Sequence, residues 1–171
     1  PLIADPRQPQ FAVRYQYYET PVVSFNAASV SFGDYFPIAS GLFDTAGSSQ
    51  IGLQGAVFAL FNLDTPSSDL VNSDYWIGVP VSYRKGRWSF LGRIYHQSSH
   101  LGDEFLLGTP GVNRINLSYE ELEMLASYDW KRWRLYGGGG YIFHSEPDLK
   151  PWHSQAGLEY IFPDVIKELD L

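Results

Sequence analysis

Apolar and polar residues alternate along most of this chain, and this period of two constrains the fold more than any other feature of the sequence. The clearest run is DYWIGVPVSYRKGRWSFLGRIYHQSS, in which the tight turn RKGR separates two alternating segments. Segments with the periodicity of an amphipathic helix are almost absent. The pattern therefore predicts an all-β chain built from antiparallel strands.

The alternation predicts eight strands, whose bounds are uncertain by about two to four residues. They fall at residues 11–18, 22–35, 51–63, 74–84, 87–98, 114–129, 132–144 and 151–162. No repeat or linker separates them, so we expect a single domain over residues 1–171. Two features fit less well: Pro80 lies inside the fourth strand, and the connection at residues 36–50 is long.

Composition agrees with β structure and excludes several classes of function. Aromatic residues make up 16% of the chain, which favours strands. The net charge of −7 argues against a nucleic-acid partner, and the absence of cysteine excludes disulfides, thiol catalysis and thiolate metal sites. The first residues, PLIADPRQPQ, contain no secretory signal pattern, so we expect any such signal to have been removed or never to have existed.

Alternation alone does not say which face of each strand is buried, so a soluble ligand-binding barrel remains open. Two patterns favour an antiparallel transmembrane β-barrel in a bacterial outer membrane, its apolar face turned to lipid. Aromatic residues lie near the ends of the apolar stripes, as in interfacial girdles: Tyr75, Tyr83, Trp88, Tyr128, Trp130, Trp133, Phe143, Trp152 and Phe162. The opposite stripes carry charges that can pair in a polar lumen: Arg14, Arg84, Arg93, Arg134, Glu121, Glu123 and Glu159.

The short turns RKGR and DWKR place one end of the predicted barrel on the periplasmic side. The connection at residues 99–113 then faces the cell exterior. The chain ends in LEYIFPDVIKELDL, without the terminal aromatic residue of a closing strand, which favours about eight strands of a larger barrel.

The sequence HQSS ends the fifth predicted strand, and His96 and Ser98 have the same parity as Trp88, Phe90 and Ile94. Polar groups on a lipid-facing stripe are unfavourable unless they lie near the interface or bond to each other. A hairpin with its pivot near Leu106 would place Asn116 of the next strand opposite His96.

These segments also resemble known families. RIYHQSSHLGDEF and PLIADPRQPQF resemble an uncharacterised family of bacterial outer-membrane β-barrel proteins, over most of the chain. HQSS followed by NLSYEELEML is similar to outer membrane phospholipase A, over about residues 93–125. That second resemblance implies an acyl hydrolase whose Ser-His-Asn triad faces the outer leaflet.

Transferred to this chain, the resemblance implies that Ser98 is the nucleophile, His96 the general base and Asn116 the group that orients the imidazole. It further implies Ca²⁺ near the oxyanion, with Asp103 as a metal ligand, membrane lipids as the substrate, and activation by dimerisation. A homodimer or membership of a membrane complex is therefore expected.

This chain departs from the phospholipase pattern in several ways. Ser99 follows the candidate nucleophile where that family has Asn, Asn113 competes with Asn116 for the third position, and the family has twelve strands. Three alternatives stay open. In the first, the chain is a non-catalytic structural or scaffolding barrel. In the second, the His and Ser residues are simply a hydrated strand end. In the third, His96 and His100 bind a divalent metal together with Asp103 or Glu104.

Two further motifs lie in the last predicted strands. The run Gly137–Gly140 predicts a bend in the barrel or a groove for a neighbouring acyl chain or side chain. Glu121 and Glu123 share the charged stripe, so we expect them to pair with lumen arginines rather than to perform acid catalysis.

Overall fold

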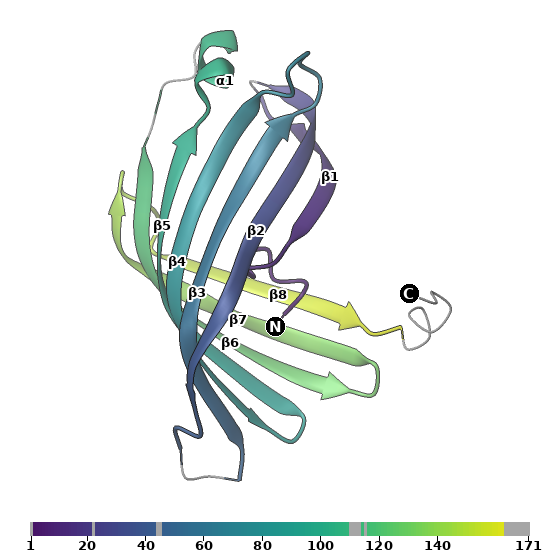
Figure 1. Cartoon of the computed structure of the whole chain (residues 1–171), viewed down its shortest axis with the longest axis vertical. Coiled ribbons are helices and arrows are strands. Elements are labelled where there is room, and N and C mark those ends of the chain that lie inside the picture. The colour runs from purple at the N-terminus through teal and green to yellow at the C-terminus, as the bar shows by residue number, and fades with distance from the viewer. Residues whose placement is uncertain (1, 22, 44–45, 110–113, 115, 163–171) are drawn as a thin grey trace.

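The computed structural model describes residues 2–21, 23–43, 46–109, 114 and 116–162. Within them the chain forms one eight-stranded antiparallel sheet in which every strand pairs with its neighbour in sequence. The sheet curls into a half-barrel, with β1 and β8 at its two edges (Figure 1). The predicted all-β fold is confirmed, and the curled sheet fits a β-barrel.

All eight predicted strands are present, and most are longer than predicted. They are β1 Ala12–Glu19, β2 Ser24–Ser40, β3 Ser48–Asn62, β4 Leu70–Lys85, β5 Trp88–Leu101, β6 Leu117–Trp130, β7 Trp133–Glu146 and β8 Trp152–Tyr160. Because β2 extends to Ser40 and β3 begins at Ser48, the connection predicted at residues 36–50 shrinks to residues 41–47. A short helix, α1 (Asp103–Gly108), occupies part of the segment predicted as a loop.

Connections of different lengths lie at the two ends of the sheet. Residues 86–87 and 131–132 form tight turns at one end, which we call the short-turn end, together with residues 41–47. The opposite end carries residues 63–69 and the long connection 102–116, with α1 at the top of Figure 1. The tight turns predicted from RKGR and DWKR are therefore confirmed.

Pro80 lies in β4, an interior strand, and the pairing of β4 with β3 is interrupted beside it. The β3–β4 pairs include Ile51 with Val81 and Gln54 with Gly78, but no pair between these two. On the other side of β4 the ladder continues through Pro80 and Arg93. Proline has no backbone N–H to donate, so it is tolerated where the ladder is already broken.

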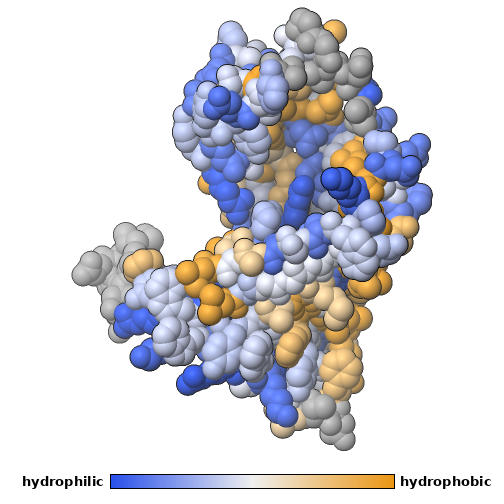
Figure 2. Space-filling view, turned by 180° about the vertical axis from the view of Figure 1, so that it is seen from behind, coloured by the Kyte–Doolittle hydropathy of each residue, from blue (hydrophilic) through white to orange (hydrophobic). Residues whose placement is uncertain are grey.

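The two faces of the sheet carry different residue types, as the alternation predicted. Trp88, Phe90 and Ile94 lie on the convex face and are about half exposed, at 50%, 46% and 54%. Residues of the opposite parity point into the curl and are buried, including Trp76, Arg93, Tyr95, Gln97, Tyr119, Glu121, Glu123 and Leu125. Figure 2 shows a hollow with hydrophilic residues along its wall and with hydrophobic patches in it and beside it.

The N-terminal segment, residues 2–11, lies inside the curl of the sheet (Figure 1). Leu2 packs against Leu125 and Tyr136, and the Asp5 carboxylate lies 2.9 Å from Arg93 Nη2. The backbone N–H of Ala4 donates to Glu159 Oε1 across 2.9 Å. This segment therefore joins the concave faces of strands from the middle and the end of the chain.

Within the part of the chain that the structure describes, no helix is both long enough and apolar enough to cross a membrane.

Candidate functional site

A row of three ionisable side chains crosses the convex face of β5, β6 and β7. His96 pairs with Glu120 in the β5–β6 register, and Glu120 pairs with His144 in the β6–β7 register. The two carboxylate oxygens of Glu120 lie 2.7 Å from His96 Nδ1 and 2.6 Å from His144 Nδ1. In the tautomer that donates from Nδ1, each imidazole keeps Nε2 as a free proton acceptor.

Ser98 and His100 lie farther along the same face of β5, towards the long connection. Ser98 Oγ is 3.0 Å from His100 Nε2, which is hydrogen-bond distance. The edge of the His100 ring meets the Tyr75 ring, with 5.9 Å between centroids. A serine hydroxyl bonded to an imidazole is the arrangement that activates serine as a nucleophile.

The structure pairs the predicted triad residues differently from the sequence hypothesis. Glu120 lies opposite His96, and Ser118 lies opposite Ser98. Asn116 is exposed and just precedes β6, four residues from Glu120, a distance of about 13 Å along an extended strand. One further step along the β5–β6 register would bring Asn116 opposite His100 rather than His96. The competing Asn113 lies outside the described residues.

Asp103, the predicted Ca²⁺ ligand, is the first residue of α1 and is exposed. Its carboxylate contacts the guanidinium of Arg114 on the same connection. Among the residues that the structure describes, Asp103 belongs to no group of three side chains placed to share a metal ion.

Glu120 is the functional residue that the sequence analysis missed. It has the parity of Leu122 and Met124, which are exposed on the convex face. The sequence did contain a signal for Glu120, because a carboxylate on an otherwise apolar stripe, in the strand after HQSS, indicates a functional residue. The alternation puts Glu120 on the apolar face, but a role was predicted only for its neighbours Glu121 and Glu123, which point the opposite way.

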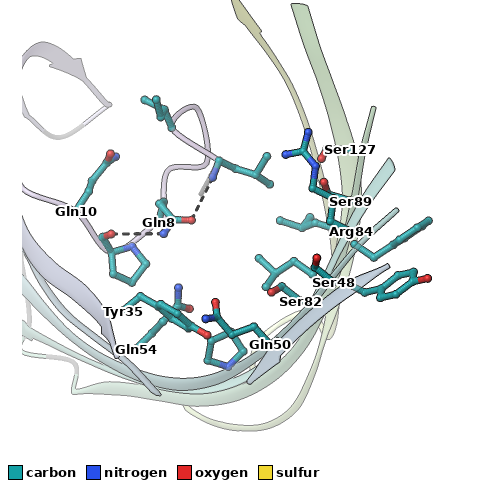
Figure 3. Close-up of a pocket in the computed structure, with 18 of the residues that line it drawn as sticks. Gln8, Gln10, Tyr35, Ser48, Gln50, Gln54, Ser82, Arg84, Ser89 and Ser127 are labelled. Carbon is teal, nitrogen blue, oxygen red and sulfur yellow. Dashed lines mark hydrogen bonds between the residues drawn. The ribbon is translucent and has the colours of Figure 1, made fainter. Parts of the chain in front are cut away.

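A cavity of about 890 Å³ opens on the concave face between the N-terminal segment and β2–β6. Figure 3 shows that its lining is rich in hydroxyl and amide groups, from Gln8, Gln10, Tyr35, Ser48, Gln50, Gln54, Ser82, Ser89 and Ser127. The Tyr35 hydroxyl and Gln54 Oε1 are buried and have no hydrogen-bond partner among the described residues. Arg84, Arg134 and Asp34 also line the cavity, so its polar groups are both neutral and charged.

Ion pairs occupy other parts of the concave face, between the apolar clusters. Arg93 is 1% exposed and contacts both Asp5 and Glu123. Arg134 contacts Glu159 at 3.3 Å and Asp129 at 2.7 Å. The predicted pairing with lumen arginines is thus confirmed for Glu123, whereas the Tyr95 hydroxyl donates to Glu121 at 2.7 Å.

These observations define the class: an all-antiparallel, barrel-like sheet with an apolar convex face and an ion-paired concave face. Over its whole length, residues 1–171, the chain matches a family described as "Protein of unknown function (DUF1207)", and it belongs to that family. Neither a curated protein nor a solved structure matches the chain.

Proposed function

We propose that this protein is an integral protein of the bacterial outer membrane and that its strands form part of the wall of a transmembrane β-barrel. The observation that carries this proposal is the placement of residue types: large apolar side chains are exposed on the convex face while ionised ones are buried on the concave face.

The exposed apolar surface is continuous across neighbouring strands. It includes Val13, Tyr15, Phe32, Phe36, Leu53, Ile77, Val79, Phe90, Ile94, Leu122, Met124 and Leu135. A water-soluble monomer rarely exposes a contiguous patch of this kind, whereas the acyl chains of membrane lipids would cover it favourably. Strands β2–β7 have 14 to 17 residues, more than the roughly 9–11 that a tilted strand needs to cross a bilayer.

Aromatic residues on this face gather near both ends of the strands. Trp88, Trp130 and Trp133 lie at the short-turn end, and Phe143 and Trp152 lie at the opposite end. Two such belts are typical of barrel walls, because amphipathic rings favour the membrane interface.

Fluorescence quenching by lipids with brominated acyl chains tests this proposal. Single-tryptophan variants that keep only Trp88 or only Trp76 place the probe on the convex or the concave face. We expect strong quenching of Trp88 and little of Trp76 in reconstituted vesicles, together with recovery of the protein in the outer-membrane fraction of cells. Equal quenching, or a protein that stays monomeric in buffer without detergent, would contradict it.

A second candidate function is an acyl hydrolase on the convex face, favoured by the 3.0 Å contact between Ser98 Oγ and His100 Nε2. In this proposal Ser98 attacks the ester carbonyl of a phospholipid while an imidazole takes its proton, and the lysolipid leaves. Water then releases the fatty acid from the serine ester. His100 is the better placed general base, because its Nε2 contacts Ser98 Oγ, and Asn116 would orient its imidazole. In the arrangement that the phospholipase resemblance implies, His96 is the base instead.

Ca²⁺ near the oxyanion, with Asp103 as a ligand, and a homodimer that encloses the acyl chains belong to this second candidate. Fatty-acid release from phospholipid micelles, with calcium or with chelator, tests it. We expect Ser98→Ala to abolish release, while Ser118→Ala, the cross-strand serine opposite, leaves it unchanged. The general base is the histidine, His100 or His96, whose replacement by Gln abolishes release. If the unmodified protein releases no fatty acid, the hydrolase proposal is wrong and the protein is a non-catalytic barrel.

A further inference from the structure

Three potential metal ligands converge on the concave face although they come from strands that are not neighbours. Glu121 and Glu123 lie on β6, His153 lies on β8, and one ligand atom from each falls within 4.8 Å of the others. His153 Nδ1 lies 3.2 Å from Glu121 Oε1, and His153 Nε2 lies 3.6 Å from Glu123 Oε1.

Gly140 of β7 allows these side chains to meet. It pairs with Glu123 on one side and with His153 on the other. A Cβ atom at this position would overlap Glu121 Oε1 and His153 Cε1. Part of the predicted glycine groove therefore holds the ends of these two side chains directly over the backbone of β7.

One carboxylate oxygen in the cluster is left without a hydrogen bond. Glu121 is 1% exposed, and its Oε2 accepts from the Tyr95 hydroxyl. Its Oε1 has no hydrogen-bond partner among the described residues and points at His153. Gln155 donates from Nε2 to Glu123 Oε1 at 2.6 Å, but its own Oε1 is also buried and unpaired. Unsatisfied buried acceptors of this kind indicate a missing electrophile or donor.

The charges around the cluster do not balance. Asp5, Glu121 and Glu123 face a single guanidinium, that of Arg93. The other concave ion pairs are balanced: Arg7 with Asp74, and Arg84 and Arg134 with Asp129 and Glu159. If Asp5, Glu121 and Glu123 are all ionised, Arg93 alone leaves two negative charges in a buried place, where unpaired charge is strongly unfavourable.

We propose that Glu121, Glu123 and His153 bind one divalent transition-metal ion, for which Zn²⁺ is the natural probe. Two carboxylates and one imidazole supply oxygen and nitrogen ligands suited to zinc, whereas Ca²⁺ and Mg²⁺ prefer oxygen ligands alone. The two positive charges of the metal ion would neutralise the two excess negative charges around the cluster. Water completes the coordination, or the side-chain carbonyl oxygen of Gln155 does so once its amide group has rotated by half a turn. His153 is 39% exposed, so the ion enters from the concave side.

The test is Zn²⁺ binding to the purified protein in detergent, first stripped with a chelator and then titrated against a fluorescent zinc chelator. We expect one tight site, at least tenfold weaker in Glu121→Gln and in His153→Gln. Gly140→Ala should remove binding by displacing the ligands. Gly137→Ala is the matched control, because its Cβ would make only ordinary contacts, and it should bind like the unmodified protein.

The convex row of His96, Glu120 and His144 could also attract zinc, so the double variant His96→Gln/His144→Gln is needed. We expect it to bind normally. Zinc should also raise the thermal unfolding midpoint of the unmodified protein and of Gly137→Ala, but not of Gly140→Ala or His153→Gln. The proposal is overturned if no saturable site is found, if His153→Gln binds undiminished, or if only the His96→Gln/His144→Gln variant loses binding.

Discussion

Arg93 and Ile94 are neighbours in the chain, and they show how different the two faces of this sheet are. Arg93 points into the curl, where it is 1% exposed and bound to two carboxylates. Ile94 points outward and is 54% exposed. Strands β4, β5 and β6 share this division: each buries at least one charged side chain on the concave face and exposes hydrocarbon side chains on the convex face.

The division explains how the concave face can be stable without a large apolar core. The buried apolar side chains form three small clusters among the described residues, and charged or polar groups separate them. Ion pairs that join different strands depend on their register, since a slip of one residue would reverse every side chain. The concave face therefore specifies the register, and the convex face meets the surrounding solvent, which we propose is lipid.

The largest effect is expected from removing the central concave cation. Arg93→Met leaves Asp5 and Glu123 buried without their partner, and breaking a buried pair in this way costs about 3–5 kcal/mol. Urea unfolding of the reconstituted protein, followed by tryptophan fluorescence, measures the change. Arg114→Ala removes an exposed pair with Asp103 and should cost about 0–1 kcal/mol. Equal losses in both variants would show that burial on the concave face adds nothing to the contribution of an ion pair.

The next effect comes from placing a charge on the convex face beside Arg93. Ile94→Arg should destabilise the protein in a bilayer by about 2–4 kcal/mol if the position lies near the midplane, because lipid solvates the guanidinium poorly. The same unfolding measurement in vesicles gives the result. Ile94→Leu serves as the control for the change in shape. A neutral effect of Ile94→Arg would show that water, not hydrocarbon, covers this face.

A smaller effect is expected from adding one methyl group to either face. Gly78 is packed on the concave side, where a Cβ would lie 2.7 Å from Tyr95 Cβ and 3.0 Å from the Ile94 carbonyl oxygen. Gly78→Ala should therefore cost about 1–3 kcal/mol through overpacking. Gly92→Ala meets nothing within 4 Å and should stabilise the strand by about 0.5–1 kcal/mol. If unfolding experiments show a lower free energy of unfolding for Gly78→Ala and a higher one for Gly92→Ala, the concave face is closely packed and the convex face is open at these positions.

The smallest effect concerns Asp64, which lies in the turn between β3 and β4 and so belongs to neither face. The side chain and backbone of Asn26 both donate to its carboxylate at 2.9 Å, which holds the pKa of Asp64 below its ordinary value of 3.8. These hydrogen bonds to the ionised carboxylate stabilise the folded state above pH 3.8, and that stabilisation is lost as the pH falls through the lower pKa that Asp64 has in the folded protein. NMR hydrogen exchange of the Asn26 amide should accelerate there, and Asp64→Asn should remove this pH dependence.

The strands and their faces could be predicted because alternation is a local property of the sequence. Trp88, Phe90 and Ile94 share a parity whatever the rest of the chain does. The pairing between strands could not be predicted in the same way. It depends on where each hairpin pivots, which alternation does not determine, and the β5–β6 register places Glu120, not Asn116, opposite His96.

The position of the N-terminal segment was also beyond prediction. Residues 2–11 show no period, and their partners Arg93 and Glu159 are far away in sequence. Likewise, the meeting of His153 with Glu121 over Gly140 depends on the bulge between Glu120 and Glu121 and on two separate registers. Such contacts depend on the curvature of the whole sheet, which no short stretch of sequence encodes.

The sequential order of the strands has a consequence for assembly. Because each strand pairs only with its chain neighbours, the sheet can grow hairpin by hairpin, and the loop between β5 and β6 is the longest one to close. Residues 2–11 precede all eight strands in the chain but contact Arg93 and Glu159, so they can dock only after β5 and β8 have taken their places. This segment, which precedes every strand in sequence, would thus dock after them and would hold the curvature of the finished sheet from its concave side.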